Sequence, residues 1–408
     1  MEVVSWGASS IFFKEFMQTK RFRKSQEQKL RGSRGQGSQA RAPEQKGARP
    51  PPSTRWGRRS NHMLQIRSRF MKTTSINSLL ALLVLSALLV VSCSKPAAEN
   101  AEGAAPAEKE GALRIAVIPK GTTHPFWKSV EAGALNAGKE NGIEIIWKGG
   151  LVESDRSQQV QIIKQFVTQK VDGIVLAPLD SKAPGIIRAV QDANAAGIPV
   201  VIMDSALEAQ AGKDFITFAA TSNKEAGKRG GETLAKLLDG KGKVVILRYI
   251  EGSASTENRE AGCIEALKEH PGIEVIADPY AAGTGTIADA KNRAISMIDK
   301  LKEADGVFAS NDPVTVGLLG ALKAKGLVGK VKFVGFDASR PTVAALRSGE
   351  IQALVAQNPF NMGFQSVAAL AKHLSGETVP QRIDTGAGIL TTDNLETAES
   401  KKLLKQAE

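Results

Sequence analysis

The 408-residue sequence is poor in the residues and motifs that mark enzymes and metal sites. It has two cysteines, Cys93 and Cys263, and four histidines, and none of them share the spacing of metal ligands. It also lacks the glycine-rich loops that bind nucleotide phosphates and the G-x-S-x-G turn of hydrolases. No nucleophile–base pairing of acyl transfer and no carboxylate pair in a glycosidase context is evident. We therefore expect no catalytic residues, no metal and no cofactor, and an enzyme is a disfavoured alternative.

The net charge of +12 comes from one end of the chain. Residues 1–70 hold 16 Lys and Arg against 4 Asp and Glu, whereas the remaining residues hold 38 of each. The rest of the chain is thus neutral, and we expect no nucleic acid as a partner. Residues 1–70 are rich in Arg, Gln, Gly and Ser and show little apolar periodicity, which predicts disorder. We interpret them as sequence ahead of the true start codon, with a basic nucleic-acid arm as the alternative.

The longest apolar run is too short to cross a membrane. Leu79–Val91 spans 13 residues, whereas a bilayer needs about 20. The run follows a short cationic head at Met71, which is typical of a secretion signal, and Met63 is another candidate start. The ending V-V-S-C resembles the lipobox of bacterial lipoproteins, which implies that Cys93 becomes the lipid-modified first residue. A buried core thiol is the alternative for Cys93.

These features divide the N-terminal part into a signal peptide and a tether. Residues 94–111 contain mostly Ala, Glu, Pro and Lys, a composition typical of a linker. After signal removal Cys263 is the one remaining thiol, so no intramolecular disulfide can form, and we expect it on a helix face as a small hydrophobe. The predicted segments are a basic segment at 1–70, a lipoprotein signal at 71–92 and a tether at 93–111.

From Leu113 onward, apolar runs of strand length alternate with amphipathic stretches of helix length. This alternation predicts an α/β fold with parallel sheets covered by helices on both faces. Because of the chain's length, we expect two doubly wound lobes with about five strands each rather than one large sheet. The expected strands are 113–119, 143–148, 171–178, 198–204 and 216–220 in the first half, and 243–249, 273–278, 306–309 and 331–336 in the second.

Polar side chains follow strand after strand at the point where each predicted strand ends. The carboxyl ends of parallel strands share one edge of a sheet, where open α/β sheets bind ligands. Each residue alone could be a helix cap or a core side chain. Together, the acids, amides and cations offer partners for hydroxyl groups, and two adjacent aromatics offer flat faces, which suits a sugar. These residues are Lys120, His124, Phe126, Trp127, Asp180, Asp204, Arg259, Asn311, Asp312, Asp337 and Gln357.

The chain from Leu113 onward resembles the periplasmic solute-binding proteins of the ribose-binding type, which share their fold with the lactose-repressor family. The resemblance rests on H-P-F-W at 124–127, N-R-E-A-G around Arg259, S-N-D at 310–312, V-G-F-D at 334–337 and V-A-Q-N-P at 355–359, in matching order. It implies two type I lobes joined by three crossings near Ala220, Asn358 and Gly386. The lobes would comprise 112–219 plus 358–386, and 220–357 plus 387–408.

The resemblance also implies the roles of the site residues. Phe126 and Trp127 would hold a sugar ring, and its hydroxyls would bind Asp204, Arg259, Asn311, Asp337 and Gln357. Lys120 stands where arabinose-binding relatives carry a ligand-contacting lysine. The ribose binders have Asn at the position of His124 and Arg at the position of Ser205. We therefore do not predict that ribose itself is the ligand. Tyr280 lies near the place of a second-lobe aromatic.

The predicted function is a monomeric, lipid-anchored receptor of the cell envelope that closes around a monosaccharide and delivers it to the permease of an ABC importer. Closure requires ligand contacts to both lobes, because only differential affinity shifts an open–closed equilibrium. A ligand sensor for a chemoreceptor or histidine kinase would use the same site. A transcription regulator of the lactose-repressor type is disfavoured, because residues 1–70 lack the apolar core of a helix-turn-helix module.

Overall fold

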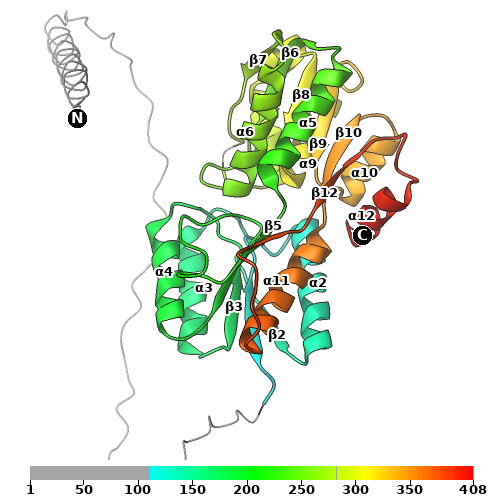
Figure 1. Cartoon of the computed structure of the whole chain (residues 1–408). Helices are drawn as coiled ribbons and strands as arrows, with labels where there is room; N and C mark the ends of the chain where they lie inside the picture. Colours follow the sequence, from blue (N-terminus) through cyan, green and yellow to red (C-terminus); the bar gives the residue numbers. More distant parts are fainter. Residues whose placement is uncertain (1–110, 282, 408) are drawn as a thin grey trace, which may run out of the picture. The chain divides into compact units, whose positions relative to one another are not determined.

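The computed structural model describes residues 111–281 and 283–407, which form two α/β lobes, each built on a six-stranded sheet (Figure 1). The strand orders are β11-β5-β4-β3-β1-β2 in the first lobe and β12-β10-β9-β8-β6-β7 in the second. Neighbouring strands are parallel except for β12, which runs antiparallel to β10. The structure confirms the predicted α/β class with two parallel sheets. The predictions for residues 1–110, including the signal peptide and Cys93, lie outside the described residues.

The central strands of the first lobe are apolar runs that are buried on both faces, as is typical of parallel strands. All four residues of β3 and all four of β4 are buried. Its elements are β1 (Arg114–Ile118), α2 (Pro125–Asn141), β2 (Glu144–Trp147), α3 (Arg156–Thr168), β3 (Gly173–Leu176), α4 (Pro184–Ala195), β4 (Val200–Met203), β5 (Phe218–Ala220), α11 (Pro359–Leu374) and β11 (Arg382–Asp384).

The second lobe repeats this plan, and its strand order has the same pattern along the chain. Its elements are α5 (Asn223–Leu237), β6 (Lys241–Leu247), α6 (Ala254–Lys268), β7 (Gly272–Ala277), α7 (Ile287–Ser296), α8 (Ile298–Glu303), β8 (Gly306–Ala309), α9 (Asp312–Ala324), β9 (Lys332–Phe336), α10 (Arg340–Arg347), β10 (Ala353–Gln357) and β12 (Ala387–Leu390). The last helix, α12 (Ala398–Ala407), contacts α2 and α11 of the first lobe as well as β12.

The chain passes from one sheet to the other at three places. Strand β5 of the first sheet leads into α5 of the second lobe, β10 leads back into α11, and β11 leads into β12. Thr221 lies in the first crossing and joins it to the other two, because its hydroxyl donates to the side chain of Gln357 at 3.0 Å and contacts the carbonyl of Gly386 at 3.3 Å. The domain limits themselves stay a prediction.

Close helix pairs at corresponding places in the two lobes fix the elements that carry the site. A Cβ atom added to Gly133 of α2 would lie 2.0 Å from the carbonyl oxygen of Phe360 in α11. A Cβ atom added to Gly227 of α5 would lie 2.0 Å from the carbonyl oxygen of Arg259 in α6. Glycine is therefore required at both contacts, and the second contact sets the position of Arg259 relative to α5.

The structure has three strands that were not among the nine expected ones. Each sheet has six strands where about five were expected: β11 and β12 are edge strands of three and four residues, and β10 is a buried strand inside the second sheet. Strand β6 ends at Leu247 rather than at Tyr249, since Arg248 forms only an isolated bridge to Tyr280. Cys263 is fully buried on α6, as predicted.

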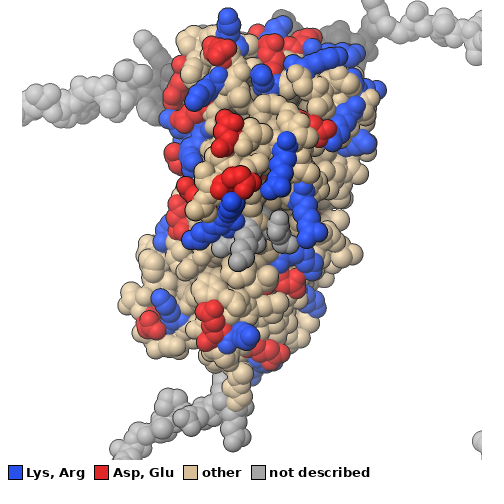
Figure 2. All heavy atoms as spheres, turned by 90° about the vertical axis from the view of Figure 1, so that its right-hand side faces the viewer, with Lys and Arg blue, Asp and Glu red and all other residues tan. Residues whose placement is uncertain are grey.

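Charge on the described part of the chain is mixed. Figure 2 shows acidic and basic side chains interspersed on one face, in agreement with the equal numbers of the two signs beyond residue 70. None of the described helices has both the length and the apolar character that a membrane crossing needs.

Candidate functional site

One cavity between the carboxyl edges of the two sheets is lined by nine of the eleven residues predicted from the strand ends, whereas Asp180 and Asp312 do not line it. The cavity has an empty volume of about 300 Å³, which includes space open to solvent. The first lobe contributes side chains that follow β1 and β4, and the second lobe contributes side chains that follow β6, β8, β9 and β10. The nine predicted residues in its wall are Lys120, His124, Phe126, Trp127, Asp204, Arg259, Asn311, Asp337 and Gln357.

The aromatic wall comes from the start of α2, where Pro125 occupies the first turn, a position that needs no backbone N–H donor. The rings of Phe126 and Trp127 lie edge to face with centroids 5.0 Å apart. Trp127 is only 2% exposed, and its indole N–H donates to a carboxylate oxygen of Glu153 at 2.7 Å. Phe126 is half-buried and is the more accessible flat face, whereas Trp127 also serves as core.

His124 precedes this helix and presents an unsatisfied polar atom. Its Nδ1 is buried and has no hydrogen-bond partner within the described residues. The imidazole lies edge to face with Phe126 at 6.4 Å between ring centroids. A buried polar atom without a partner costs free energy, so a group of a bound molecule that pairs with it would remove this cost.

Asp204 and Asp337 occupy equivalent places in the two lobes and share an unusual backbone. Asp204 follows β4, and Asp337 follows β9, which is the corresponding strand of the second sheet. Their φ angles are +61° and +70°, in the left-handed region that costs most residues about 1–3 kcal/mol. Such strain is concentrated at functional sites in proteins. Here it turns two buried carboxylates toward one cavity.

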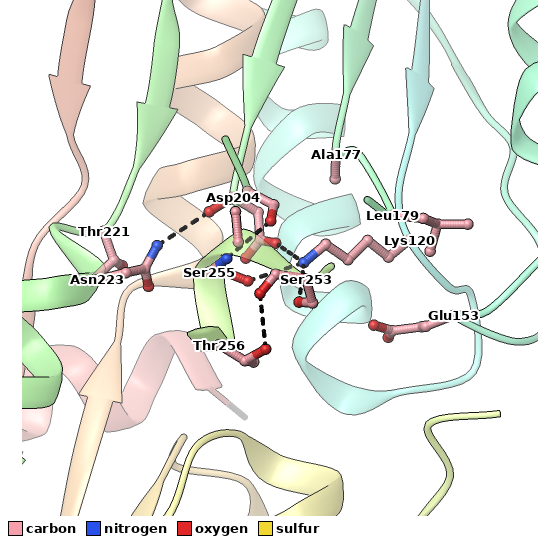
Figure 3. A network of polar contacts seen from close by, with 12 residues as sticks. Lys120, Glu153, Ala177, Leu179, Asp204, Thr221, Asn223, Ser253, Ser255 and Thr256 are labelled. Atoms are coloured by element: carbon pink, nitrogen blue, oxygen red, sulfur yellow. Dashed lines mark hydrogen bonds and ion pairs between the residues drawn. The ribbon is translucent and has the colours of Figure 1, made fainter. Parts of the chain in front are cut away.

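Lys120 links the two lobes at one end of the cavity (Figure 3). Its ammonium, 4% exposed, pairs with Asp204 at 2.8 Å and donates to the hydroxyls of Ser253 and Ser255 of the second lobe at 3.3 and 3.0 Å. An ammonium has three N–H donors, so protein atoms satisfy all three. The Ser255 backbone N–H adds another bond between the lobes by donating to the hydroxyl of Ser205 at 3.0 Å.

Arg259 is the buried cation of the second lobe. It is 2% exposed and stacks on Phe336, with its guanidinium carbon 4.1 Å from the ring centroid. Its Nε donates to the Asn223 side chain at 2.8 Å and its Nη1 to the carbonyl of Ser310 at 3.1 Å, but the buried Nη2 has no partner among the described residues. Burial lowers the pKa of Arg259, and the nearby carboxylate of Asp337 opposes that shift.

The remaining polar wall is ordered by hydrogen bonds within the second lobe. One carboxylate oxygen of Asp337 accepts from the Gln357 amide at 2.7 Å, and the other accepts from the backbone N–H of Asp312 at 2.8 Å. The Asn311 side-chain oxygen caps α9 by accepting from the Val314 N–H at 3.2 Å. Capping and cavity lining are therefore combined in Asn311.

The cavity also includes residues that the sequence reasoning missed. Tyr249, 2% exposed, is the aromatic of the second lobe in the cavity wall, whereas Tyr280 does not line it and instead contacts Arg248. Burial, and then the charge of Glu153, raise the pKa of Tyr249 well above its ordinary value. Three of the missed residues belong to the hydroxyl-rich sequence S-A-S-T at 253–256, which could have indicated further hydrogen-bonding groups at the site. The missed residues are Glu153, Tyr249, Ser253, Ser255 and Thr256.

The turn before α6 is fastened to the first lobe outside this cavity. The Arg156 guanidinium donates to the carbonyl of Glu251 at 3.0 Å, and the Ser181 N–H donates to the carbonyl of Gly252 at 3.1 Å. Arg156 also pairs with Asp180 of its own lobe at 2.7 Å. These contacts hold the two lobes together independently of the residues that line the cavity.

The chemistry of the site suits recognition. Within 111–281 and 283–407, no group of three or more His, Cys, Asp or Glu side chains could hold a metal ion. The cavity offers carboxylate acceptors, a guanidinium donor, amides and an aromatic face, the set that recognises a small polyhydroxylated molecule through directed hydrogen bonds.

Comparison with known proteins identifies the family. Residues 115–378 match the family described as periplasmic binding protein domain. The chain belongs to this family. Its members are solute-binding proteins and not enzymes, as expected from the sequence. The D-ribose/D-allose-binding protein of Pseudomonas aeruginosa is 29% identical to this chain over 300 residues, which cover 72% of the chain and 92% of that protein.

Solved structures of the family share the two-lobed fold. An ABC transporter solute-binding protein from Agrobacterium vitis with bound D-fucose is 33% identical, with a TM-score of 0.68 and coverage of 71% of this chain and 99% of that one. A carbohydrate transporter solute-binding protein from Agrobacterium radiobacter in complex with D-arabinose is 30% identical, with a TM-score of 0.67 and coverage of 72% and 100%. The predicted type I fold of periplasmic binding proteins is thereby confirmed.

Proposed function

We propose that this protein is the solute-binding component of an ABC importer and that it holds one monosaccharide in the cavity between its lobes. The observation that carries the proposal is the convergence of nine polar and aromatic side chains from both lobes on a single cavity. Related proteins bind D-ribose, D-allose, D-arabinose or D-fucose, which supports a pentose or hexose as the ligand.

The binding mechanism follows from the placement of the partners. Asp204 and Lys120 belong to the first lobe, whereas Arg259 and Asp337 belong to the second, so a sugar that contacts both sets favours the closed form. The unpartnered Nη2 of Arg259 would donate to a sugar hydroxyl, and Phe126 would cover a C–H face of the ring. The closed form is then the state that the importer's permease would recognise.

The cell-envelope location and the lipid anchor belong to the same proposal. Secretion is supported by the apolar run that ends at Val91 and by membership of a periplasmic family. The V-V-S-C sequence supports lipid attachment at Cys93, with residues 94–111 as the tether. The protein would then work as a monomer held to the membrane by its lipid alone.

A thermal-shift screen tests the binding proposal. Protein beginning at Ser94 is heated with pentoses, hexoses, polyols and nucleosides, each at about 100 times an expected micromolar Kd. A ligand at that excess stabilises the native state by about 2.7 kcal/mol, which corresponds to a rise of about 4 °C for a protein of this size. One or a few sugars should give such a rise. A flat response across all four classes would contradict the proposal.

A paired substitution separates binding from folding. Asp337→Asn keeps the size of the side chain but removes the carboxylate that contacts Gln357, whereas Asp239→Asn changes an aspartate that also has a positive φ, +52°, at the end of a helix away from the cavity. Only the first substitution should abolish the shift with the best sugar. If both variants respond like the unchanged protein, the cavity is not the binding site.

A further inference from the structure

A second, larger cavity adjoins the sugar cavity at the mouth between the lobes. Its empty volume is about 730 Å³, which includes space open to solvent. His124 and Glu153 line both cavities, so the two spaces share a wall on the first lobe. The second lobe contributes the segment from Thr284 to Ala288 and the start of α9 to the outer cavity.

The outer cavity has apolar side chains on both of its sides. Among the described residues three large hydrophobic side chains are exposed: Leu135, Leu151 and Ile287. Leu151, 73% exposed, lines the outer cavity from the first lobe, and Ile287, 44% exposed, lines it from the second, whereas Leu135 does not line it. Single exposed hydrophobic residues are common in proteins. Two of them on opposite sides of one cavity next to a binding site suggest a ligand that covers both.

The wall on the second lobe is held in place before any ligand arrives. The carboxylate of Asp289 accepts from the backbone N–H and hydroxyl groups of both Thr284 and Thr286, with O···N and O···O distances of 2.8–3.3 Å. The Tyr249 hydroxyl donates to the carbonyl of Gly285 at 3.1 Å and so joins this wall to the inner cavity. A fixed wall reduces the entropy that a ligand loses on binding.

We propose that the outer cavity is a subsite for an apolar substituent on the sugar, so that the protein accepts glycosides with an alkyl or aryl group as well as free sugars. The proposal rests on the sugar function proposed above. The ring would occupy the inner cavity, the substituent would pass His124 and Glu153, and Leu151 and Ile287 would cover it from the two lobes. The otherwise unpartnered Nδ1 of His124 lies at the junction, where it could pair with the glycosidic oxygen through a bound hydroxyl or water.

Calorimetric titrations with matched ligands and variants test the subsite. The probes are the pentoses and hexoses of the thermal-shift screen, together with their methyl and 4-nitrophenyl α- and β-glycosides. At least one aryl glycoside should bind as tightly as the free sugar. The double variant Leu151→Ser, Ile287→Ser should weaken that glycoside about tenfold or more, since two apolar contacts are lost. The same variant should change the affinity for the free sugar less than twofold, and so should the control Leu135→Ser for both probes.

The outcomes separate the two proposals. If free sugars bind and every glycoside binds more than tenfold more weakly, the subsite is refuted and the sugar function stands. If glycosides bind and free sugars do not, the subsite is supported and the ligand class becomes glycosides. If the double variant weakens both probes equally, or neither, the apolar pair does not contact the substituent and belongs to another surface, such as the contact with a permease. Absence of binding by all probes contradicts both proposals.

Discussion

Substitution of Gly252 should weaken sugar binding although this residue does not line the cavity. Gly252 has a φ of +90° and lies in the turn that the first lobe holds. A Cβ atom at this position would lie 2.7 Å from both Cγ and Oδ2 of Asp180, which is on the opposite lobe. Gly252→Ala therefore introduces a clash that exists only when the lobes are closed, together with backbone strain that exists in both forms.

The structure gives the size of the effect. To make room, Asp180 must leave its partners, the Arg156 Nε at 2.7 Å and the Lys182 N–H at 2.9 Å. Hydrogen bonds to charged groups contribute about 1.5–3 kcal/mol each, and the lower end applies because the Arg156 side chain is 41% exposed. A loss of about 1.5 kcal/mol corresponds to a dissociation constant about tenfold higher.

Calorimetry on Gly252→Ala and a matched control isolates this effect. Gly376 has a φ of +82° and no atom within 4 Å of an added Cβ, so Gly376→Ala shares the backbone strain without the clash. Both variants should lose similar stability without sugar, by about 1–3 kcal/mol, and only Gly252→Ala should bind the sugar about tenfold more weakly. Equal affinities of the two variants would refute the closure argument.

Four further variants or measurements test other parts of the account. Lys120→Met leaves Asp204 buried without its cation when the lobes are closed, so sugar affinity should fall about 100-fold or more in a calorimetric titration. The control Lys182→Met removes a 72% exposed side chain, and this variant should bind the sugar with unchanged affinity. Arg259→Lys keeps the charge but loses the planar donors, and calorimetry should show binding at least about tenfold weaker. Burial raises the pKa of the Cys263 thiol, so a maleimide should label it only after unfolding in urea, and fast labelling of native protein would contradict its burial. Cys93→Ser should release the protein from membranes in a fractionation experiment, and unchanged retention would exclude the lipid anchor.

Much of the fold and the location of the site could be predicted because parallel sheets place the ends of their strands at one edge. The apolar runs that became β1, β3 and β4 are buried on both faces, so their limits in the sequence are clear. A polar residue directly after such a run can therefore be predicted from the sequence to lie at the edge of the sheet where ligands bind. Asp204 and Asp337 are examples, and the structure brings both to the same cavity.

The rest depends on tertiary contacts that leave little trace in the sequence. Glu153 lies in the loop after β2 and reaches the cavity because the Trp127 indole holds its carboxylate. Tyr249 and Tyr280 lie on neighbouring segments, and only the packing of Tyr249 against Gly285 determines which ring lines the cavity. The position of Lys120 between the lobes likewise requires the closed arrangement, because two of its three partners are about 130 residues away.

The two aspartates with positive φ angles show where local strain and function coincide. A residue in the left-handed region at the end of a strand lowers stability, and the same backbone turns each carboxylate toward the space between the lobes. Asp204→Gly would relieve the strain but also remove the anion that pairs with Lys120 at 2.8 Å, so the sugar-dependent rise in melting temperature should disappear. The strained backbone at these two aspartates thus lowers the stability of the fold but places their carboxylates where they can bind a sugar.

A crystal structure of the protein grown with the sugar that gives the largest thermal shift tests the central claim most directly. The account predicts one sugar ring in the cavity of about 300 Å³, against Phe126 and within hydrogen-bond distance of Asp204, Arg259 and Asp337. A sugar bound elsewhere, or a ring that contacts only one lobe, would contradict it.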